Sequence, residues 1–94
     1  MEQTSRSLFP LSNIWLDELP TTFTHAFLEC LAYEWMVEIV HPYPLPLLEE
    51  KEIVLTISME QTDGTTIAKL PIESYSIEAG HEFTVYRFYM YPPK

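Results

Sequence analysis

The sequence predicts an α+β fold in which one main helix packs on a three-stranded antiparallel β-sheet, preceded by an N-terminal arm. Three observations support this prediction. Residues 22–40 repeat apolar side chains at helical spacing, Asp63 and Gly64 lie between two alternating apolar runs, and a third alternating run follows near the C-terminus. At 94 residues, the chain 1–94 is expected to form a single domain.

The N-terminal segment divides into two parts. Residues 1–7 are polar, and we expect them to be frayed. Residues 8–20 form the arm, an irregular or one-turn helical segment with Ser12 as a candidate helix cap. The arm is rich in apolar side chains that can anchor it to a larger layer: Leu8, Phe9, Leu11, Ile14, Trp15, Leu16 and Leu19. We therefore expect it to pack against the rest of the domain.

Residues 22–40 are predicted to be helical. Thr22 or Thr24 can cap the helix after Pro20, and Pro42 ends it because the residue before a proline avoids the helical region. At about 100° per residue, one arc collects the side chains that a sheet would bury: Leu28, Leu31, Ala32, Trp35, Met36 and Ile39. The opposite face is acidic and partly apolar: Glu29, Cys30, Tyr33, Glu34, Val37 and Glu38.

Residues 41–51 have prolines at alternate positions, which favours an extended connector. Residues 52–91 should then form the three strands. The Asp-Gly pair indicates a two-residue type I′ hairpin, because both central residues of that turn need positive φ. The resulting register places Ile57 opposite Leu70 and Met59 opposite Ala68.

The sequence leaves two arrangements open for the three strands. A three-residue loop with Gly80 in the left-handed conformation would pair Ile72 with Tyr86, or a register two residues away from it. Pro71 would then lie in the central strand, although a proline has no amide hydrogen to donate. Either the sheet is not a simple meander, or a bulge lies at residues 69–71.

Alternation predicts two apolar sheet faces. The first is expected to be the core under the helix: Ile53, Leu55, Ile57, Met59, Ala68, Leu70, Ile72, Tyr86, Phe88 and Met90. The second mixes charges with many apolar residues: Val54, Ile67, Pro71, Tyr75, Ile77, Phe83, Val85, Tyr89 and Tyr91. The arm can cover this second face from within the chain, or a second copy in a two-fold dimer can cover it from outside.

The charge is uneven along the chain. Residues 1–50 hold eight acidic residues and one base, Arg6, out of a total formal charge of −9. The absence of Lys and Arg between Ser7 and Glu50 argues against direct binding of this half to nucleic acid phosphates. A basic surface on another protein is the natural complement.

The sequence shows no sign of export or of a membrane span. The most apolar stretch, residues 26–40, contains Glu29, Glu34 and Glu38, and the N-terminus does not open with a basic segment. The single cysteine, Cys30, fits a reducing compartment. We expect a cytoplasmic protein that does not bind membranes.

Residues suited to catalysis, metals or cofactors are scarce. His25, His41 and His81 lack the spacing and the cysteine partners of a zinc site. In a helix, Glu34 would lie one turn from Cys30 and raise rather than lower the pKa of its thiol. We therefore predict no enzyme activity, no catalytic residues, no metal site and no cofactor.

Protein binding is the predicted function, as an inhibitor or neutraliser of a basic partner. Size and charge are those of small acidic phage or viral anti-defence proteins, such as anti-CRISPR proteins, and of toxin immunity proteins. The acidic helix face is the predicted partner surface: Glu29, Tyr33, Glu34, Val37 and Glu38. The second sheet face is predicted to bind a partner or a second copy: Tyr75, Phe83, Val85, Arg87, Tyr89 and Tyr91. The alternative is a structural subunit or assembly factor that uses this aromatic face.

Overall fold

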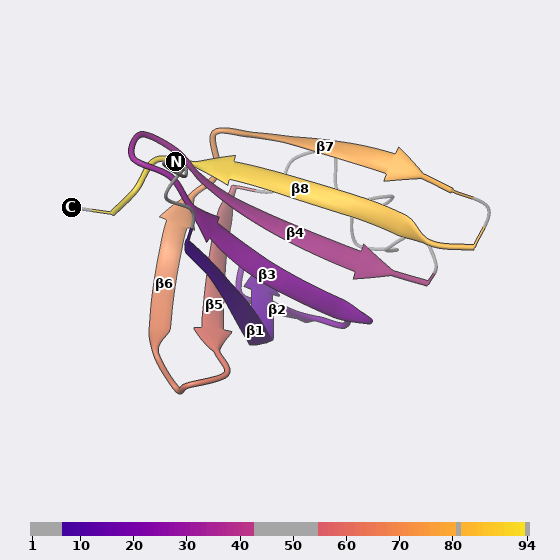
Figure 1. Cartoon of the computed structure of the whole chain (residues 1–94), viewed down its shortest axis with the longest axis horizontal. Coiled ribbons are helices and arrows are strands. Elements are labelled where there is room, and N and C mark those ends of the chain that lie inside the picture. Colours follow the sequence, from indigo (N-terminus) through magenta and orange to yellow (C-terminus); the bar gives the residue numbers. More distant parts are fainter. Residues whose placement is uncertain (1–6, 43–54, 81, 94) are drawn as a thin grey trace, which may run out of the picture.

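The computed structural model describes residues 7–42, 55–80 and 82–93, and this part of the chain is all β (Figure 1). Its strands are β1 (Ser7–Leu16), β2 (Leu19–Thr21), β3 (His25–Cys30), β4 (Trp35–His41), β5 (Thr56–Gln61), β6 (Thr66–Pro71), β7 (Ser74–Ala79) and β8 (Thr84–Met90). They pair antiparallel in the order β6-β5-β1-β3-β4-β8-β7, and β2 also pairs with β1. The predicted α+β fold, with one helix on a three-stranded sheet, is therefore wrong.

The segment predicted as a helix, residues 22–40, contains the hairpin of β3 and β4 instead. Its side chains alternate as in strands: Leu28 on β3 and Val37 and Ile39 on β4 are fully buried. The backbone N–H of Leu31 donates to the carbonyl of Glu34 over 3.1 Å and closes the turn. Because β4 is rich in β-branched residues, which lose side-chain freedom in a helix, its composition favours the extended form.

The predicted packing arm, residues 8–20, is part of the sheet. Residues 7–10 of β1 pair with β3 and residues 11–16 pair with β5, with a bulge between Leu11 and Asn13. Strand β1 thus belongs to two facing layers. The first layer contains the start of β1 with β3, β4, β8 and β7, and the second contains the rest of β1 with β2, β5 and β6. In Figure 1, β5 and β6 run across the direction of β3, β4 and β8.

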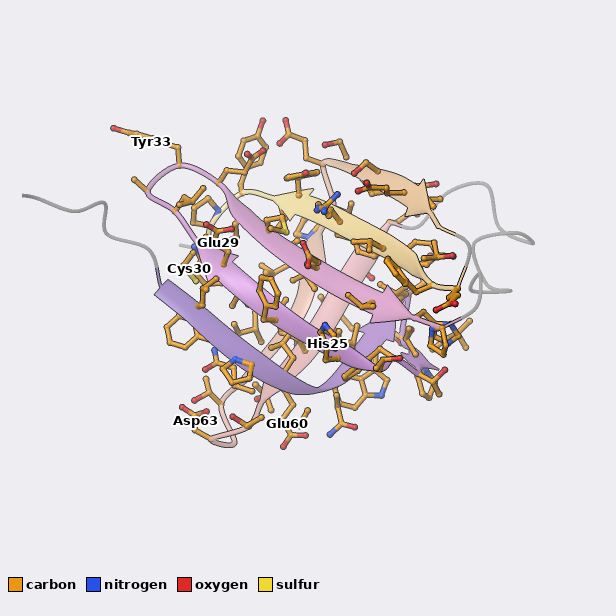
Figure 2. The ribbon with its side chains drawn as sticks, turned by 45° about the vertical axis from the view of Figure 1, so that its right-hand side comes forward. His25, Glu29, Cys30, Tyr33, Glu60 and Asp63 are labelled. Carbon is orange, nitrogen blue, oxygen red and sulfur yellow. The ribbon has the colours of Figure 1, made fainter. Side chains whose placement is uncertain are left out.

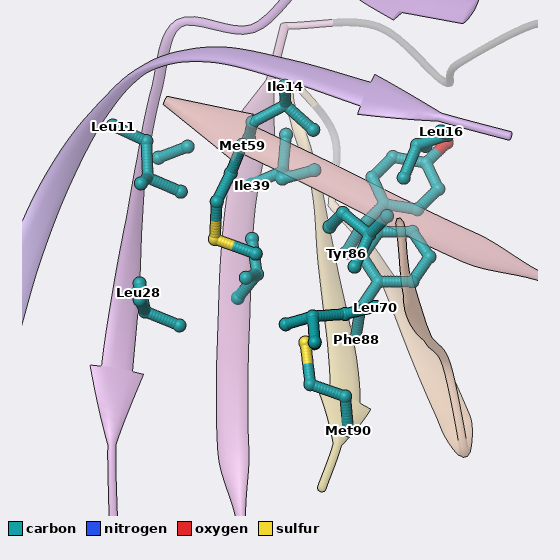
Figure 3. Packing of buried hydrophobic residues seen from close by; sticks show 13 residues of the cluster. Leu11, Ile14, Leu16, Leu28, Ile39, Met59, Leu70, Tyr86, Phe88 and Met90 are labelled. Atoms are coloured by element: carbon teal, nitrogen blue, oxygen red, sulfur yellow. The ribbon is translucent and has the colours of Figure 1, made fainter. Parts of the chain in front are cut away.

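The hydrophobic core lies between the two layers, and Figure 3 shows most of its members. It contains Leu11, Ile14, Leu16, Ala26, Leu28, Val37, Ile39, Ile57, Met59, Leu70, Tyr86, Phe88 and Met90. Burial of a Leu, Ile or Phe side chain stabilises the fold by about 1.5–3 kcal/mol. The arm therefore packs on the face that was predicted to lie under a helix, rather than on the second sheet face.

The predicted hairpin between β5 and β6 is confirmed, but the predicted type I′ turn at Asp63-Gly64 is wrong. Of these two residues only Gly64 has positive φ, 96°, and its N–H donates to the carbonyl of Gln61 over 2.9 Å, so that Thr62 and Asp63 are the central residues of the turn. Ile57 lies opposite Leu70 as expected, but Met59 lies opposite Ile67 because a bulge shifts the register beyond Ile57. At this bulge Lys69 has a φ of 58° and donates its N–H to Ser58 Oγ over 2.9 Å. Both explanations for Pro71 hold: the register is bulged, and β6 is an edge strand.

The meander register predicted for the last two strands is wrong. The chain leaves β6 after Pro71, and β7 pairs with β8 on the far side of the first layer, with Tyr75 opposite Phe88 and Ile77 opposite Tyr86. Most of the predicted first face is nevertheless buried: Ile57, Met59, Leu70, Tyr86, Phe88 and Met90. Leu55 and Ala68 are exposed instead.

Some sequence predictions fall on residues outside the described part. These are the frayed start at residues 1–6, most of the connector at residues 43–51, and the side chains of Ile53, Val54 and His81. The described remainder of the connector includes His41, which belongs to β4 and is buried.

Candidate protein-binding surface

The pairing of β4 with β8 brings members of the two predicted binding sets onto one face. Glu38 lies opposite Arg87, and Met36 lies opposite Tyr89. We call the outward side of β3, β4, β8 and β7 the outer face. Strand alternation and register assign to it His25, Phe27, Glu29, Met36, Glu38, Val40, Ser74, Ser76, Glu78, Val85, Arg87 and Tyr89.

The other predicted site residues lie elsewhere. Val37 is in the core, and Tyr75 faces inward with its ring centroid 5.5 Å from that of Phe88. Phe83 lies just before β8, at the end of this strand away from Tyr91, and is 49% exposed. The predicted aromatic sheet face is thus divided between the interior, the outer face and the two ends of β8.

Arg87 on β8 forms ion pairs with acids on both neighbouring strands, β4 and β7. Its Nε donates to Glu38 Oε1 on β4 and its Nη1 donates to Glu78 Oε1 on β7, each over 3.0 Å. The hydrogen bonds to Glu78 and to Glu38 raise the pKa of Arg87. The only other Lys or Arg in residues 7–42, 55–80 and 82–93 is Lys69, which pairs with Glu18 over 3.0 Å. Both cations of the described part are therefore neutralised by neighbouring acids.

A group of exposed tyrosines and acids lies at the end of the outer face where β4 begins and β8 ends. Trp35 lies opposite Met90 in the last pair of this ladder. Glu34 and Tyr91 are therefore the next residues beyond the ends of β4 and β8. The hydroxyl of Tyr91 donates to Glu73 Oε2 over 2.7 Å. This hydrogen bond and the negative charge of Glu73 raise the pKa of Tyr91, with a smaller contribution from the charge of Glu34.

We call Tyr33, Glu34, Glu73 and Tyr91 the acidic tyrosine patch. Tyr33 is 87% exposed and Tyr91 is 64% exposed. Figure 2 shows Tyr33 projecting from the turn between β3 and β4, far from Asp63 at the tip of the β5–β6 hairpin. Glu29, also in the predicted set, is only 6% exposed. A partner would therefore touch the patch itself rather than Glu29.

Sequence reasoning named Tyr33, Glu34 and Tyr91 but assigned them to two separate surfaces. It missed Glu73 as a site residue, because no local pattern relates it to Tyr91. The only signal for their proximity is the non-local pairing of β8 with both β4 and β7.

Cys30 and the described histidines do not combine into a reactive site. The Cys30 side chain packs against the core, and burial, rather than a neighbouring carboxylate, raises the pKa of its thiol. His41 Nε2 lies 3.2 Å from Thr22 Oγ1, and His25 is exposed on β3. Within the described ranges there is no pocket and no group of three His, Cys, Asp or Glu side chains that could hold a metal ion.

Among the residues that the structure describes, no helix has the length and apolar character needed to cross a membrane. Comparisons of the chain with protein-family models, with curated proteins and with solved structures found no match.

Proposed function

We propose that this protein binds a basic surface on another protein through its acidic tyrosine patch and the adjoining outer face, and thereby inhibits or neutralises that partner. The observation that supports the proposal most directly is the register of β4 on β8. It brings Glu34 of one hairpin near Tyr91 and Glu73 of another, and the exposed Tyr33 precedes Glu34 in the β3–β4 turn.

The chemistry of the patch suits protein recognition. Tyrosine provides a large apolar ring and a polar hydroxyl, and it is enriched in the residues that dominate binding energy. The hydrogen bond between Tyr91 and Glu73 restricts both side chains before a partner arrives, so less conformational freedom is lost on binding.

The charge distribution selects the partner. Arg87 and Lys69 are already engaged by Glu38, Glu78 and Glu18, which leaves the acids of the patch facing solvent. With a formal charge of −9 on the whole chain, electrostatic attraction favours encounter with a basic protein surface and speeds association.

A charge reversal with a matched control tests this proposal. Glu34→Lys reverses a charge within the patch, whereas Glu82→Lys makes the same change in the exposed loop between β7 and β8. We expect Glu34→Lys to weaken capture of the partner from a lysate of the source cells about tenfold, which corresponds to about 1.4 kcal/mol. Glu82→Lys should bind as the wild type does.

Tyr33→Ala and Tyr91→Ala test the aromatic contribution in the same assay, and each is expected to weaken capture. Equal capture by the wild type, Glu34→Lys and both alanine variants would contradict the proposed surface. Capture that is lost only in Tyr89→Ala and does not respond to salt would support the structural-subunit alternative instead.

A further inference from the structure

The chain contains two aspartates, Asp17 and Asp63, and they differ in the residue that follows. Glu18 follows Asp17, whereas Gly64 follows Asp63. Because glycine has no side chain, it leaves its backbone nitrogen open to approach by the preceding residue. That nitrogen can attack the aspartate carboxyl group and close a succinimide ring. Asp63 is therefore the aspartate that is chemically suited to this rearrangement.

Asp63 and Gly64 lie in an open place, at the tip of the β5–β6 hairpin. Both residues are exposed, and a Cβ atom built on Gly64 would meet no heavy atom within 4 Å. Water therefore reaches both reacting groups and the ring that they would form. No neighbouring side chain hinders the reaction here.

Two hydrogen bonds of the turn hold the reacting groups away from each other. The N–H of Gly64 donates to the carbonyl of Gln61 over 2.9 Å. The N–H of Thr65 donates to Asp63 Oδ1 over 2.9 Å. The attacking nitrogen has to lose the proton that it donates to Gln61, and the carboxyl group has to leave Thr65. The closed turn therefore opposes ring closure at both reacting groups.

The ionisation of Asp63 acts in the same direction. The hydrogen bonds from Thr65 lower the pKa of the Asp63 carboxyl group. Ring closure proceeds through the neutral acid, which can release water, because a carboxylate is a poor electrophile. At a given pH the closed turn thus contains less of the reactive form.

We propose that Asp63 is a site of isoaspartate formation and that opening of the β5–β6 hairpin controls its rate. In the open hairpin, Gly64 N attacks Cγ of Asp63, a C–N bond forms, and the carboxyl hydroxyl leaves as water with the amide proton. Water then opens the ring. Attack at Cγ restores aspartate, and attack at the backbone carbonyl leaves the chain linked through Cγ, which is isoaspartate. The water lost in the first step returns in the second, so no oxidant or other co-reactant is needed.

Strand β6 is suited to open locally. It lies at the end of the strand order and pairs with β5 alone among the described strands, and a bulge interrupts this pairing. Leu70 is its only buried residue. Segments held by few buried contacts open at a lower free energy than the whole fold. We therefore expect the opening that exposes Asp63 to be local.

Isoaspartate would change the turn permanently. The backbone between Asp63 and Gly64 becomes one carbon longer, and the free carboxylate is then attached directly to Cα. The strand register beyond the turn, with Ile57 opposite Leu70, has to accommodate the longer connection. Figure 2 shows Asp63 far from Tyr33, so this site and its test are independent of the proposed binding function.

The rate of isoaspartate formation in the folded and the unfolded protein tests the proposal. Wild-type protein is incubated at neutral pH, with and without enough urea to unfold it, and peptide mapping with electron-transfer fragmentation locates isoaspartate. We expect Asp63 to isomerise in urea and to do so at least about tenfold more slowly in the folded protein. Asp17 is the internal control, because the side chain of Glu18 hinders the attack. A smaller difference, or isomerisation of Asp17 as fast as that of Asp63 in urea, would overturn the proposal.

Asp63→Asn separates the geometry of the turn from the ionisation of the carboxyl group. The amide is uncharged, but its oxygen can still accept from Thr65 N, and ring closure now releases ammonia. Peptide mapping detects the mass change after hydrolysis, and Asn13 is the internal control because the β-branched Ile14 follows it. We again expect a rate at least about tenfold lower in the folded than in the unfolded variant. A smaller difference would mean that ionisation protects Asp63, and it would overturn control by the hairpin.

Discussion

At the scale of single residues, the phenol of Tyr91 reports directly on the acidic tyrosine patch. Its pKa lies above the usual 10.0, chiefly because it donates a hydrogen bond to Glu73. A raised folded-state pKa means that the interaction stabilises the fold below pH 10 and is lost as the pH rises through the folded-state pKa. We expect Glu73→Gln to lower the pKa of Tyr91, as measured by an NMR titration of the tyrosine ring. An unchanged pKa would place Glu73 away from Tyr91.

Asp17 is a second residue whose role can be measured. Its Oδ1 accepts hydrogen bonds from Leu55 N over 3.0 Å and Thr56 N over 2.9 Å, and its own φ is 51°. Asp17→Ala removes the acceptor and places an alanine in the left-handed region, at an expected cost of about 1–3 kcal/mol. Asp17→Asn keeps both the oxygen and the tolerance of this conformation, so it should cost less. Urea unfolding measures both variants, and equal stability of Asp17→Ala and wild type would contradict this role.

At the scale of elements, the β5–β6 hairpin could be predicted from sequence but the β3–β4 hairpin could not. The Asp63-Gly64 pair marks a turn between two alternating runs, although only Gly64 has positive φ and the type I′ geometry is not formed. The turn at residues 31–34 contains neither glycine nor proline. Because no turn-forming residue separates β3 from β4 in the sequence, their two short alternating runs read as one continuous segment. The apolar residues of that segment also fit the spacing of a helix. The β-branched side chains of β4 were the local signal that favoured strands.

Ala32→Pro distinguishes the two descriptions of this segment experimentally. In a helix interior the substitution costs about 3 kcal/mol or more. In the turn between β3 and β4, where Ala32 does not have positive φ, we expect a loss below about 1 kcal/mol. Urea unfolding gives the difference. A loss near 3 kcal/mol, together with a helical signal in the wild-type circular dichroism spectrum, would contradict the all-β structure.

At the scale of the whole molecule, the sequence predicted which side chains of β5, β6 and β8 are buried better than it predicted the surface. Six side chains expected in the core are buried, because alternation within β5, β6 and β8 assigns them to one side. The candidate surface could not be assembled in the same way. Glu38 meets Arg87, and Glu34 approaches Tyr91, only because β4 and β8 pair across more than forty residues of sequence. No local pattern encodes that pairing.

The acidic tyrosine patch and the negative charge of the chain lead to one expectation for binding. The dissociation constant for the captured partner should rise steeply with ionic strength in the wild type, because the attraction is between exposed charges. In Glu34→Lys the constant should be higher at low salt and depend less on salt, while Glu82→Lys should follow the wild type.

The most direct test of the account is therefore the dissociation constant of the partner complex measured from low to high salt for these three proteins. A steep salt dependence that Glu34→Lys reduces and Glu82→Lys leaves unchanged is the result expected for a basic partner bound at the acidic tyrosine patch. A dissociation constant that is independent of salt and identical in all three proteins would contradict it.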